Sequence, residues 1–371
     1  MSDKRQLDST CQLTASERKI MAIVLRSGEI ARSAVTEKTD LSQQSVHRLV
    51  DSLEKRVYLR YGEARIVGRG KPSPTLFVDP DHYTSAGVSI GTEDVRFCLV
   101  TLAGKPLFEE TLHFDPIRPD AVLDVLKAKL SDWTAANRTN RVLVGIGVSM
   151  QGFRGGAPDV FFPPLPLASW QGIALEALFN EALGLPAFAE NNATSSAIAE
   201  HYLGAGAGHD CIAYLSFNHG FGCGIFAEGA AFRGAHGNAG EISAVYDKTE
   251  LPRRPALSQL INVLSEHNIH TTSVRDLTAR FQPDWPGVAE WLEDVKPQLQ
   301  LALRALQATI DPGAIFFGGE APDALRRLFV EIGRGTFRDQ RLAMPDLVVS
   351  ELQGDPAHLG AALLPLHRLI F

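Results

Sequence analysis

The sequence predicts an α/β protein with two domains, a small helical domain followed by a large domain in which strands and helices alternate. The chain has 371 residues, which exceeds the usual single-domain size of roughly 100 to 200 residues. Helical spacing of apolar residues dominates the first 80 residues, whereas extended apolar runs separated by glycines begin near residue 83. We therefore expect domains at 1–80 and 81–371.

Composition places the chain among ordinary globular proteins. Apolar residues make up 45% and charged residues 21%, both close to the globular average. No apolar run approaches 18 residues and the first residues are polar, so we expect no membrane span, no secretory leader and a cytoplasmic location. The 4 cysteines lack C-x-x-C spacing, which argues against a disulfide framework or a cysteine zinc site.

Charge is distributed unevenly between the two expected domains. The segment 1–80 holds 14 Lys and Arg against 10 Asp and Glu, whereas the remainder holds 22 against 33. A basic surface attracts the phosphate backbone of nucleic acids and an acidic one repels it. Only the amino-terminal domain is therefore electrostatically suited to bind DNA.

The amino-terminal segment carries the start signals of three successive helices. Thr14 and Glu17 have the spacing of a capping box, which predicts a helix over 15–27. A second helix is expected over 31–38, and Ser42 is a favourable N-cap for a third. Helix, short turn and helix therefore follow one another.

The third helix presents polar residues at its amino-terminal end. Its apolar residues from Val46 to Leu53 follow helical spacing and form one buried stripe. A recognition helix inserts its amino-terminal end into the major groove, where Gln pairs with adenine and Arg with guanine. An ordinary three-helix bundle with a polar surface would have the same pattern. The candidate DNA contacts are Gln43, Gln44, Ser45, His47 and Arg48.

A basic loop between two predicted strands favours a winged helix-turn-helix over a simple bundle. The strands are expected at 57–61 and 75–78, around the loop 68–74. Arg69 and Lys71 of this loop are positioned to reach phosphates or a narrow minor groove. A solvated, Pro-rich linker is the alternative interpretation.

The large domain begins with strands followed by a helix and another strand. Apolar runs at 86–92 and 97–102 predict a hairpin, and the run at 142–148 predicts a third strand. Between them, the stripe from Val122 to Trp133 predicts a helix over 120–136. The expected order is strand, strand, helix, strand.

Polar turns interrupt the second half of the α/β pattern. A strand over 185–192 ends in a polar turn and precedes a helix over 193–202. A strand at 211–217 is followed by the glycine-rich turn 218–224 and a second strand at 225–227. Such glycines can approach a phosphate closely, but they also form ordinary hairpins.

Four segments carry a resemblance to a known family: Glu190–Ala193, the glycine turn 220–224, Arg233–Glu241 and Ile315–Gly319. They occur in the order and at the spacing of the ROK family, the family of repressors, open reading frames and kinases. The chain resembles this family throughout, and most of all its regulators, such as the xylose and N-acetylglucosamine repressors. The resemblance implies a two-lobed, actin-like (ribonuclease H-like) domain, with lobe 1 at about 81–190 plus the C-terminal helix and lobe 2 at about 191–354.

Three departures from the kinase pattern imply a domain without catalysis or zinc. Asn192 stands where ROK kinases carry the aspartate base, and an amide cannot take the proton of a sugar hydroxyl. Ser89 replaces an aspartate of the phosphate motif, and Glu93 would repel a triphosphate. Ala244 replaces a zinc-binding histidine. We therefore expect no catalytic residue, no metal and no cofactor.

The resemblance also implies a set of residues around a sugar-like ligand. Convergent polar groups in an interlobe cleft suit a polyol, because each buried hydroxyl needs a partner. Two alternatives remain open at this point, since Glu241 could instead cap the following helix and the histidines could be structural. The expected ligand contacts are Asn191, Asn192, Glu241, Gly152 and His236.

These patterns together predict a dimeric, sugar-responsive repressor of carbohydrate metabolism genes. The expected partners are double-stranded operator DNA, a small sugar-like effector and a second copy of the chain, with no membrane. Two other functions are compatible with the sequence. One is an active ATP-dependent sugar kinase with a DNA-binding appendage, and the other is a regulator whose large domain only dimerises.

Overall fold

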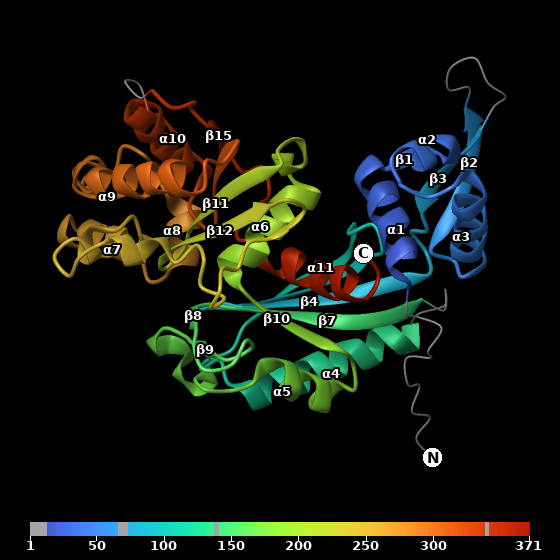
Figure 1. Ribbon diagram of the computed structural model, residues 1–371. Helices are drawn as coiled ribbons and strands as arrows, with labels where there is room; N and C mark the ends of the chain where they lie inside the picture. The colour runs from blue at the N-terminus through green and yellow to red at the C-terminus, as the bar shows by residue number, and fades with distance from the viewer. Residues whose placement is uncertain (1–12, 66–72, 137–140, 338–340) are drawn as a thin grey trace.

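The computed structural model describes residues 13–65, 73–136, 141–337 and 341–371 (Figure 1). The amino-terminal domain contains an antiparallel sheet in the order β1-β3-β2 packed on its helices. Its elements are α1 (Ala15–Ser27), β1 (Glu29–Ala31), α2 (Arg32–Glu37), α3 (Gln43–Lys55), β2 (Leu59–Arg65) and β3 (Ser73–Val78).

The capping box predicted at the start of α1 is present. The Glu17 amide donates to the Thr14 hydroxyl over 3.3 Å, and the Thr14 amide donates to the Glu17 carboxylate over 2.8 Å. The same carboxylate pairs with Arg56 at 2.9 Å, which ties α1 to the end of α3. The second helix begins one residue later than expected, because 29–31 pairs with β3 as a short strand.

The first lobe of the large domain is a mixed sheet in the order β10-β7-β4-β5-β6. The order predicted from the sequence omitted one strand, β6, which forms the exposed edge beside β5. Helices α4 and α5 cover one face of this sheet and α11 covers the other (Figure 1). The elements are β4 (Tyr83–Ile90), β5 (Val95–Thr101), β6 (Pro106–Leu112), α4 (Pro119–Ala136), β7 (Val142–Met150), β8 (Phe153–Arg154), β9 (Phe161–Phe162), α5 (Leu175–Leu183), β10 (Ala187–Asn191) and α11 (Ala357–Leu369).

The second lobe has a sheet in the order β13-β12-β11-β14-β15. Helices α7, α9 and α10 cover its outer face, and α6 packs on β11 and β12 from the inner side (Figure 1). The elements are α6 (Asn192–Leu203), β11 (Cys211–Phe217), β12 (Phe221–Ala227), β13 (Ala230–Ala231), α7 (Leu257–Glu266), α8 (Val274–Arg280), α9 (Val288–Thr309), β14 (Ala314–Gly318), α10 (Asp323–Phe337) and β15 (Asp346–Val349).

Helices α6 and α11 form the layer between the two sheets. They approach so closely that a Cβ atom at Gly360 would lie 1.7 Å from the carbonyl oxygen of Ser195. Glycine is therefore required there by packing. The two helices share one apolar core with the amino-terminal domain, where the rings of Tyr58 and Tyr83 stack at 4.5 Å. The DNA-binding candidate thus rests directly on the large domain.

No helix among the described residues is long and apolar enough to span a membrane.

Candidate functional site

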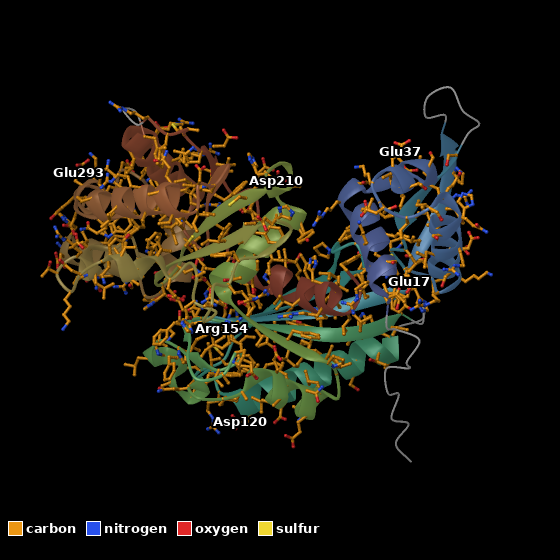
Figure 2. All side chains as sticks on the ribbon, in the orientation of Figure 1. Glu17, Glu37, Asp120, Arg154, Asp210 and Glu293 are labelled. Carbon is orange, nitrogen blue, oxygen red and sulfur yellow. The ribbon has the colours of Figure 1, made fainter. Side chains whose placement is uncertain are left out.

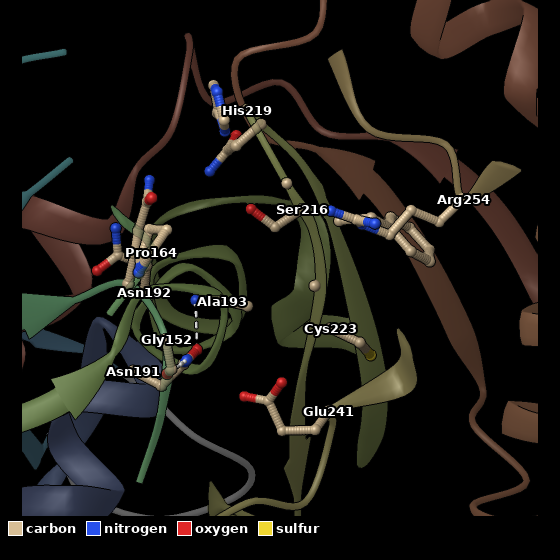
Figure 3. A pocket seen from close by; sticks show the side chains of 15 residues that line it. Gly152, Pro164, Asn191, Asn192, Ala193, Ser216, His219, Cys223, Glu241 and Arg254 are labelled. Atoms are coloured by element: carbon tan, nitrogen blue, oxygen red, sulfur yellow. Dashed lines mark hydrogen bonds between the residues drawn. The ribbon is translucent and has the colours of Figure 1, made fainter. Parts of the chain in front are cut away.

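A cavity of about 270 Å³ lies between the two lobes (Figure 3). Residues from the end of β7 and the start of α6 form one wall, and residues of β11, β12 and two following loops form the other. This volume lies just below the range of roughly 300 to 1,000 Å³ that is typical of drug-sized ligands, so it fits a monosaccharide. The lining includes Gly152, Asn191, Asn192, Ser216, His219, Cys223, Glu241 and Arg254.

Asn191 lines the cavity, but its side chain is largely used by the fold. Its Oδ1 accepts from the amides of Ala193 and Thr194 at 2.8 and 3.3 Å, which caps α6. Its Nδ2 donates to the carbonyl oxygen of Gly152 over 2.8 Å. Asn191 therefore joins α6 to the loop after β7 and shapes the wall, with one N–H left for a ligand.

Asn192, at the position where the family resemblance expects a base, belongs to a buried chain of neutral groups. Its Oδ1 accepts from the Ser149 hydroxyl over 2.7 Å, and its Nδ2 donates to the Ser89 hydroxyl over 3.4 Å. The side chain is 4% exposed. Ser89 and Asn192, which both stand where the family resemblance expects an aspartate, are thus hydrogen-bonded to each other.

Glu241 faces the cavity from the opposite wall (Figure 3). It precedes a 3₁₀ turn at Ile242–Val245 but makes no side-chain cap, so the capping alternative is wrong. Burial raises the pKa of this carboxyl above its usual range. Its side chain has no hydrogen bond or ion pair among the described residues, so its oxygens are available to ligand hydroxyls.

The sequence analysis missed Arg254 and Ser216, and it did not single out Cys223 as part of the site. Arg254 directly follows a second 3₁₀ turn, Leu251–Arg253. Its guanidinium points toward Ser216 (Figure 3). The Ser216 hydroxyl is buried and has no hydrogen-bond partner in the described structure. Burial, with a smaller effect of the nearby Glu241, raises the pKa of the Cys223 thiol to about 12. The thiol therefore stays protonated and uncharged at neutral pH. No local motif marked these residues.

The glycines of the segment 220–224 have a packing role. Strand β12 begins at Phe221, so only residues 218–220 form the turn, and the predicted longer turn is wrong. A Cβ atom at Gly224 would lie 2.0 Å from the carbonyl oxygen of Ala193. The absence of a side chain lets the start of α6 lie directly on β12, which brings the two walls of the cavity together.

A buried carboxylate next to Asn191 links elements around the cavity. Glu190 is 1% exposed and pairs with Arg154 of β8 and with Arg233, whose Nε lies 2.6 Å away. Arg154 lies where the lobes meet (Figure 2). A buried charge that loses its partner is strongly destabilising, so this triad should stabilise the junction of β8, β10 and the loop that holds Arg233.

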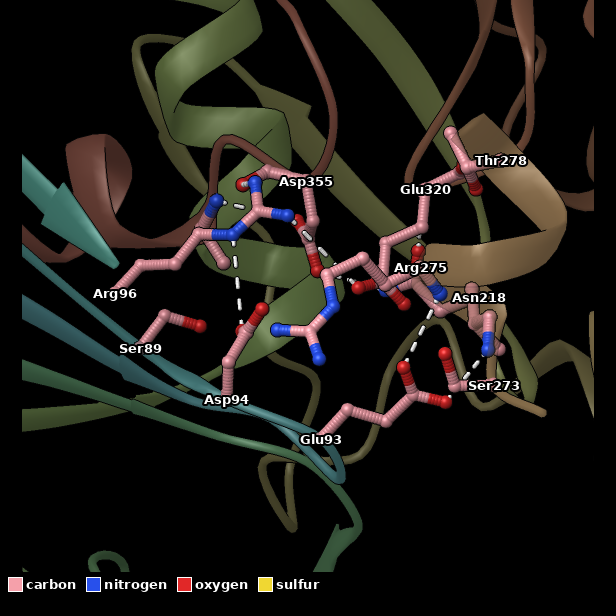
Figure 4. Close-up of polar contacts among 12 residues, drawn as sticks. Ser89, Glu93, Asp94, Arg96, Asn218, Ser273, Arg275, Thr278, Glu320 and Asp355 are labelled. Carbon is pink, nitrogen blue, oxygen red and sulfur yellow. Dashed lines mark hydrogen bonds and ion pairs between the residues drawn. The ribbon is translucent and has the colours of Figure 1, made fainter. Parts of the chain in front are cut away.

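Polar contacts join the two lobes beside Ser89 and Glu93, the segment that the family resemblance assigns to a phosphate motif (Figure 4). Glu93, in the turn between β4 and β5, accepts from the backbone amides of Val274 and Arg275 over 2.6 and 3.1 Å. These amides begin α8 in the other lobe, where a negative charge is stabilised. Arg275 also contacts the ring of His113 at 3.0 Å.

Arg96 extends these contacts with a network of acidic partners. Its guanidinium donates to the Asp355 carbonyl over 3.2 Å and lies 3.8 Å from Asp94 and 3.9 Å from Glu320. Asn218 donates to the Asp355 carboxylate over 2.7 Å and accepts from the Glu320 amide. Burial, together with the nearby Asp355, raises the pKa of Glu320 to about 8. A triphosphate would meet several carboxylates here.

The structure brings only some of the other predicted site residues to the positions expected for them. Gly152 lines the cavity, whereas His236 is exposed and is not among the lining residues, so the structure does not bring His236 to the predicted site. In α3, Gln43, Gln44 and Arg48 are exposed and Ser45 and His47 are half-buried, while Val46, Val50 and Leu53 form the buried stripe. Arg69 and Lys71 lie outside the described residues. The DNA contacts therefore remain predictions.

Sequence comparisons point to one family. The model of the ROK family matches residues 85–250. An uncharacterized protein of Sinorhizobium fredii, y4fQ, is 27% identical over 374 residues, covering 97% of this chain and 93% of that protein. The Bacillus subtilis xylose repressor is 26% identical over 63% of this chain, and the Escherichia coli dual regulator NagC is 27% identical over 61%. These alignments span only 61% and 56% of the two regulators.

Solved structures show the same two-lobed architecture. A ROK family transcriptional regulator, a homologue of the E. coli MLC protein, aligns with a TM-score of 0.74 at 18% identity over 96% of both chains. A ROK glucokinase from Streptomyces griseus aligns with a TM-score of 0.61 at 19% identity over 76% of this chain and 98% of that one. The large domain thus has the actin-like fold of sugar kinases. Residues 85–250 thus match the ROK family model, and they follow an amino-terminal region of three helices and a three-stranded sheet.

Proposed function

We propose that this protein is a DNA-binding regulator, a repressor of carbohydrate metabolism genes, that senses a sugar or sugar derivative and does not phosphorylate it. The observation that carries the proposal is the division of the interlobe cleft. Its sugar side is an open cavity with an unpaired carboxylate, Glu241, while its phosphate side is closed by Glu93 and the Arg96 network. Ligand binding is retained in such a cleft and phosphoryl transfer is lost.

The amino-terminal domain supports the DNA-binding half of the proposal. Three exposed polar residues at the start of α3, Gln43, Gln44 and Arg48, have the side chains that read base edges in the major groove. The relatives include proteins named xylose repressor and NagC, a DNA-binding transcriptional regulator. Paired winged helices on a homodimer would read half-sites about 34 to 36 Å apart.

Two elements connect the cavity with the amino-terminal domain. Helix α6 begins at the cavity with Asn191 and ends with His201 and Tyr202, which lie beside Arg26 of α1 in a second cavity of about 220 Å³. Strand β12 also begins at the cavity, and the turn that follows it contains Gly229, where a Cβ atom would lie 2.3 Å from the Arg26 guanidinium. A ligand that moves the second lobe would therefore move the contact surface of α1.

The alternative of an active kinase is less well supported. A phosphate donor would have to displace the contact between Glu93 and α8, and Asn192 offers no base. The alternative of a purely dimerising domain leaves the buried Glu241 and the cavity without a role.

Two assays on the purified full-length chain test the proposal. Selection of genomic DNA fragments should recover a shared, two-fold symmetric site, and a coupled ATPase assay with a panel of hexoses should give no turnover above background. Sugar-dependent ATP turnover would establish a kinase instead. Failure to enrich any sequence would remove the regulator function.

A further inference from the structure

The second-lobe wall of the interlobe cavity carries two opposite charges that do not neutralise each other. Neither Glu241 nor Arg254 forms an ion pair with any described residue. Within the part of the chain that the structure describes, the Arg254 guanidinium has one hydrogen bond, to the carbonyl oxygen of Leu251 in its own loop at 2.9 Å. Burial lowers the pKa of Arg254 and raises that of Glu241, as expected for charges without a compensating partner.

A half-buried guanidinium without a carboxylate needs another acceptor. Its planar fork of N–H donors matches the paired oxygens of a carboxylate or phosphate. The Ser216 hydroxyl, toward which Arg254 points, is a second donor without an acceptor and is 3% exposed. Two donors that lack acceptors therefore meet on the same wall of the cavity, next to the half-buried His219.

The other charge constrains the rest of the ligand. Glu241 can only accept hydrogen bonds when ionised, so the group that faces it must donate, as a sugar hydroxyl does. On the facing wall, Asn191 keeps one amide N–H that suits a further hydroxyl. A neutral sugar would satisfy Glu241 but would leave Arg254 with no anionic partner.

We propose that the effector is a monosaccharide with one anionic group, a carboxylate or a phosphate, which Arg254 and Ser216 bind while Glu241 binds ring hydroxyls. This inference rests on the proposed sensing function, and it names the ligand class of that same site. The cavity volume of about 270 Å³ holds one sugar ring with one such substituent.

Calorimetric titration of the full-length protein with matched sugars tests the proposal. The probes are glucose, glucuronate and glucose 6-phosphate, and galactose, galacturonate and galactose 6-phosphate. In at least one series an anionic member should bind about 10-fold more tightly than its neutral parent, the factor expected for one charge-assisted hydrogen bond. The uronate and phosphate arms distinguish the two anions.

Matched variants assign the preference to one side chain. Arg254→Gln should reduce the anion preference to less than about 3-fold, Arg254→Lys should keep part of it because the charge remains, and Arg253→Gln, at the exposed neighbouring position, should keep all of it. Each variant is first compared with the wild type by thermal unfolding.

The outcomes separate the ligand class from the sensing function. Neutral sugars that bind as tightly as their anionic partners, or an anion preference that survives in Arg254→Gln, overturn the anionic ligand and leave sugar sensing intact. If no sugar binds a protein that still binds its DNA sites, the sensing function fails, and the anionic ligand fails with it.

Discussion

Two side chains near the phosphate motif that the resemblance implies, Asn192 and Glu93, form hydrogen bonds within the protein. Asn192 donates to Ser89 and accepts from Ser149, so an amide and a hydroxyl are hydrogen-bonded to each other at the two positions where the family resemblance expects carboxylates. Glu93 accepts from backbone amides of α8. Each of these side chains therefore forms hydrogen bonds within the protein, which fits the proposal of a domain without phosphoryl transfer.

Glu320 should make the stability of the protein depend on pH. Its pKa is raised to about 8 by burial and by Asp355, so the folded protein holds a proton that the unfolded chain releases near pH 4.5. The stabilisation is complete below about pH 4.5 and is lost as the pH rises toward 8, by at most about 1.4 kcal/mol per pH unit. Glu320→Gln should therefore gain stability relative to the wild type between pH 5 and 8.

Urea unfolding at pH 5, 6, 7 and 8 measures this gain. The exposed Glu351→Gln variant should follow the wild type at every pH. A difference between Glu320→Gln and the wild type that stays constant with pH would show that this carboxyl does not hold its proton in the folded state.

Arg48 should contribute directly to sequence-specific DNA binding. It is exposed near the amino-terminal end of α3, and a side chain that reads a base edge is worth about 1 to 3 kcal/mol. Arg48→Ala should weaken binding to the selected site by about 10-fold or more. Fluorescence anisotropy measures the effect, with Arg304→Ala, exposed on α9, as a control. Affinity like that of the wild type would exclude Arg48 from the interface.

Lys71 belongs to the predicted wing, outside the described residues. A contact to the phosphate backbone carries no sequence information, so Lys71→Ala should weaken binding to all sequences alike and reduce its salt dependence. A loss confined to one sequence would contradict this role.

At the level of elements, α6 and β12 both connect the interlobe cavity with the surroundings of α1. Both begin at the cavity wall and end where Arg26 lies against the second lobe. Rigid secondary elements of this kind transmit small displacements between packed surfaces. The contact of Arg26 is therefore the place where ligand binding would reach the DNA-binding domain.

Arg26→Ala should make DNA affinity independent of effector binding. The variant should bind effector as the wild type does, but the effector should change its DNA affinity by less than about 3-fold, since the expected coupling of about 1 to 3 kcal/mol is carried through this contact. Lys19→Ala removes a side chain of α1 that pairs with Asp40 instead and should keep full coupling. Full coupling in Arg26→Ala would place the connection elsewhere.

Local elements were predictable from the sequence, and contacts between distant segments were not. The capping box of Thr14 and Glu17 and the buried stripe of α3 depend on residues within one or two helical turns. Strand β1 was missed because it has three residues and pairs with β3, more than 40 residues later. Arg254 was missed for a similar reason, since only the folding of the second lobe brings it into the same cavity lining as Ser216.

At the level of the whole molecule, the amino-terminal domain and both lobes are packed around α6 and α11. One apolar core runs from the first helices through Tyr58 and Tyr83 to α11 and into the second sheet. Closure of the phosphate side by Glu93 leaves the sugar side as the place where a ligand can change the relation between the lobes. Such an arrangement favours a sensor over an enzyme.

The effect of the effector on DNA affinity tests this account most directly. A labelled duplex carrying the selected site is titrated with the full-length protein, without effector and with effector at saturation established by calorimetry. We predict that the dissociation constant changes by about 10-fold or more, in line with coupling energies of about 1 to 3 kcal/mol. Equal dissociation constants, within a factor of about two, with the effector bound would contradict the account.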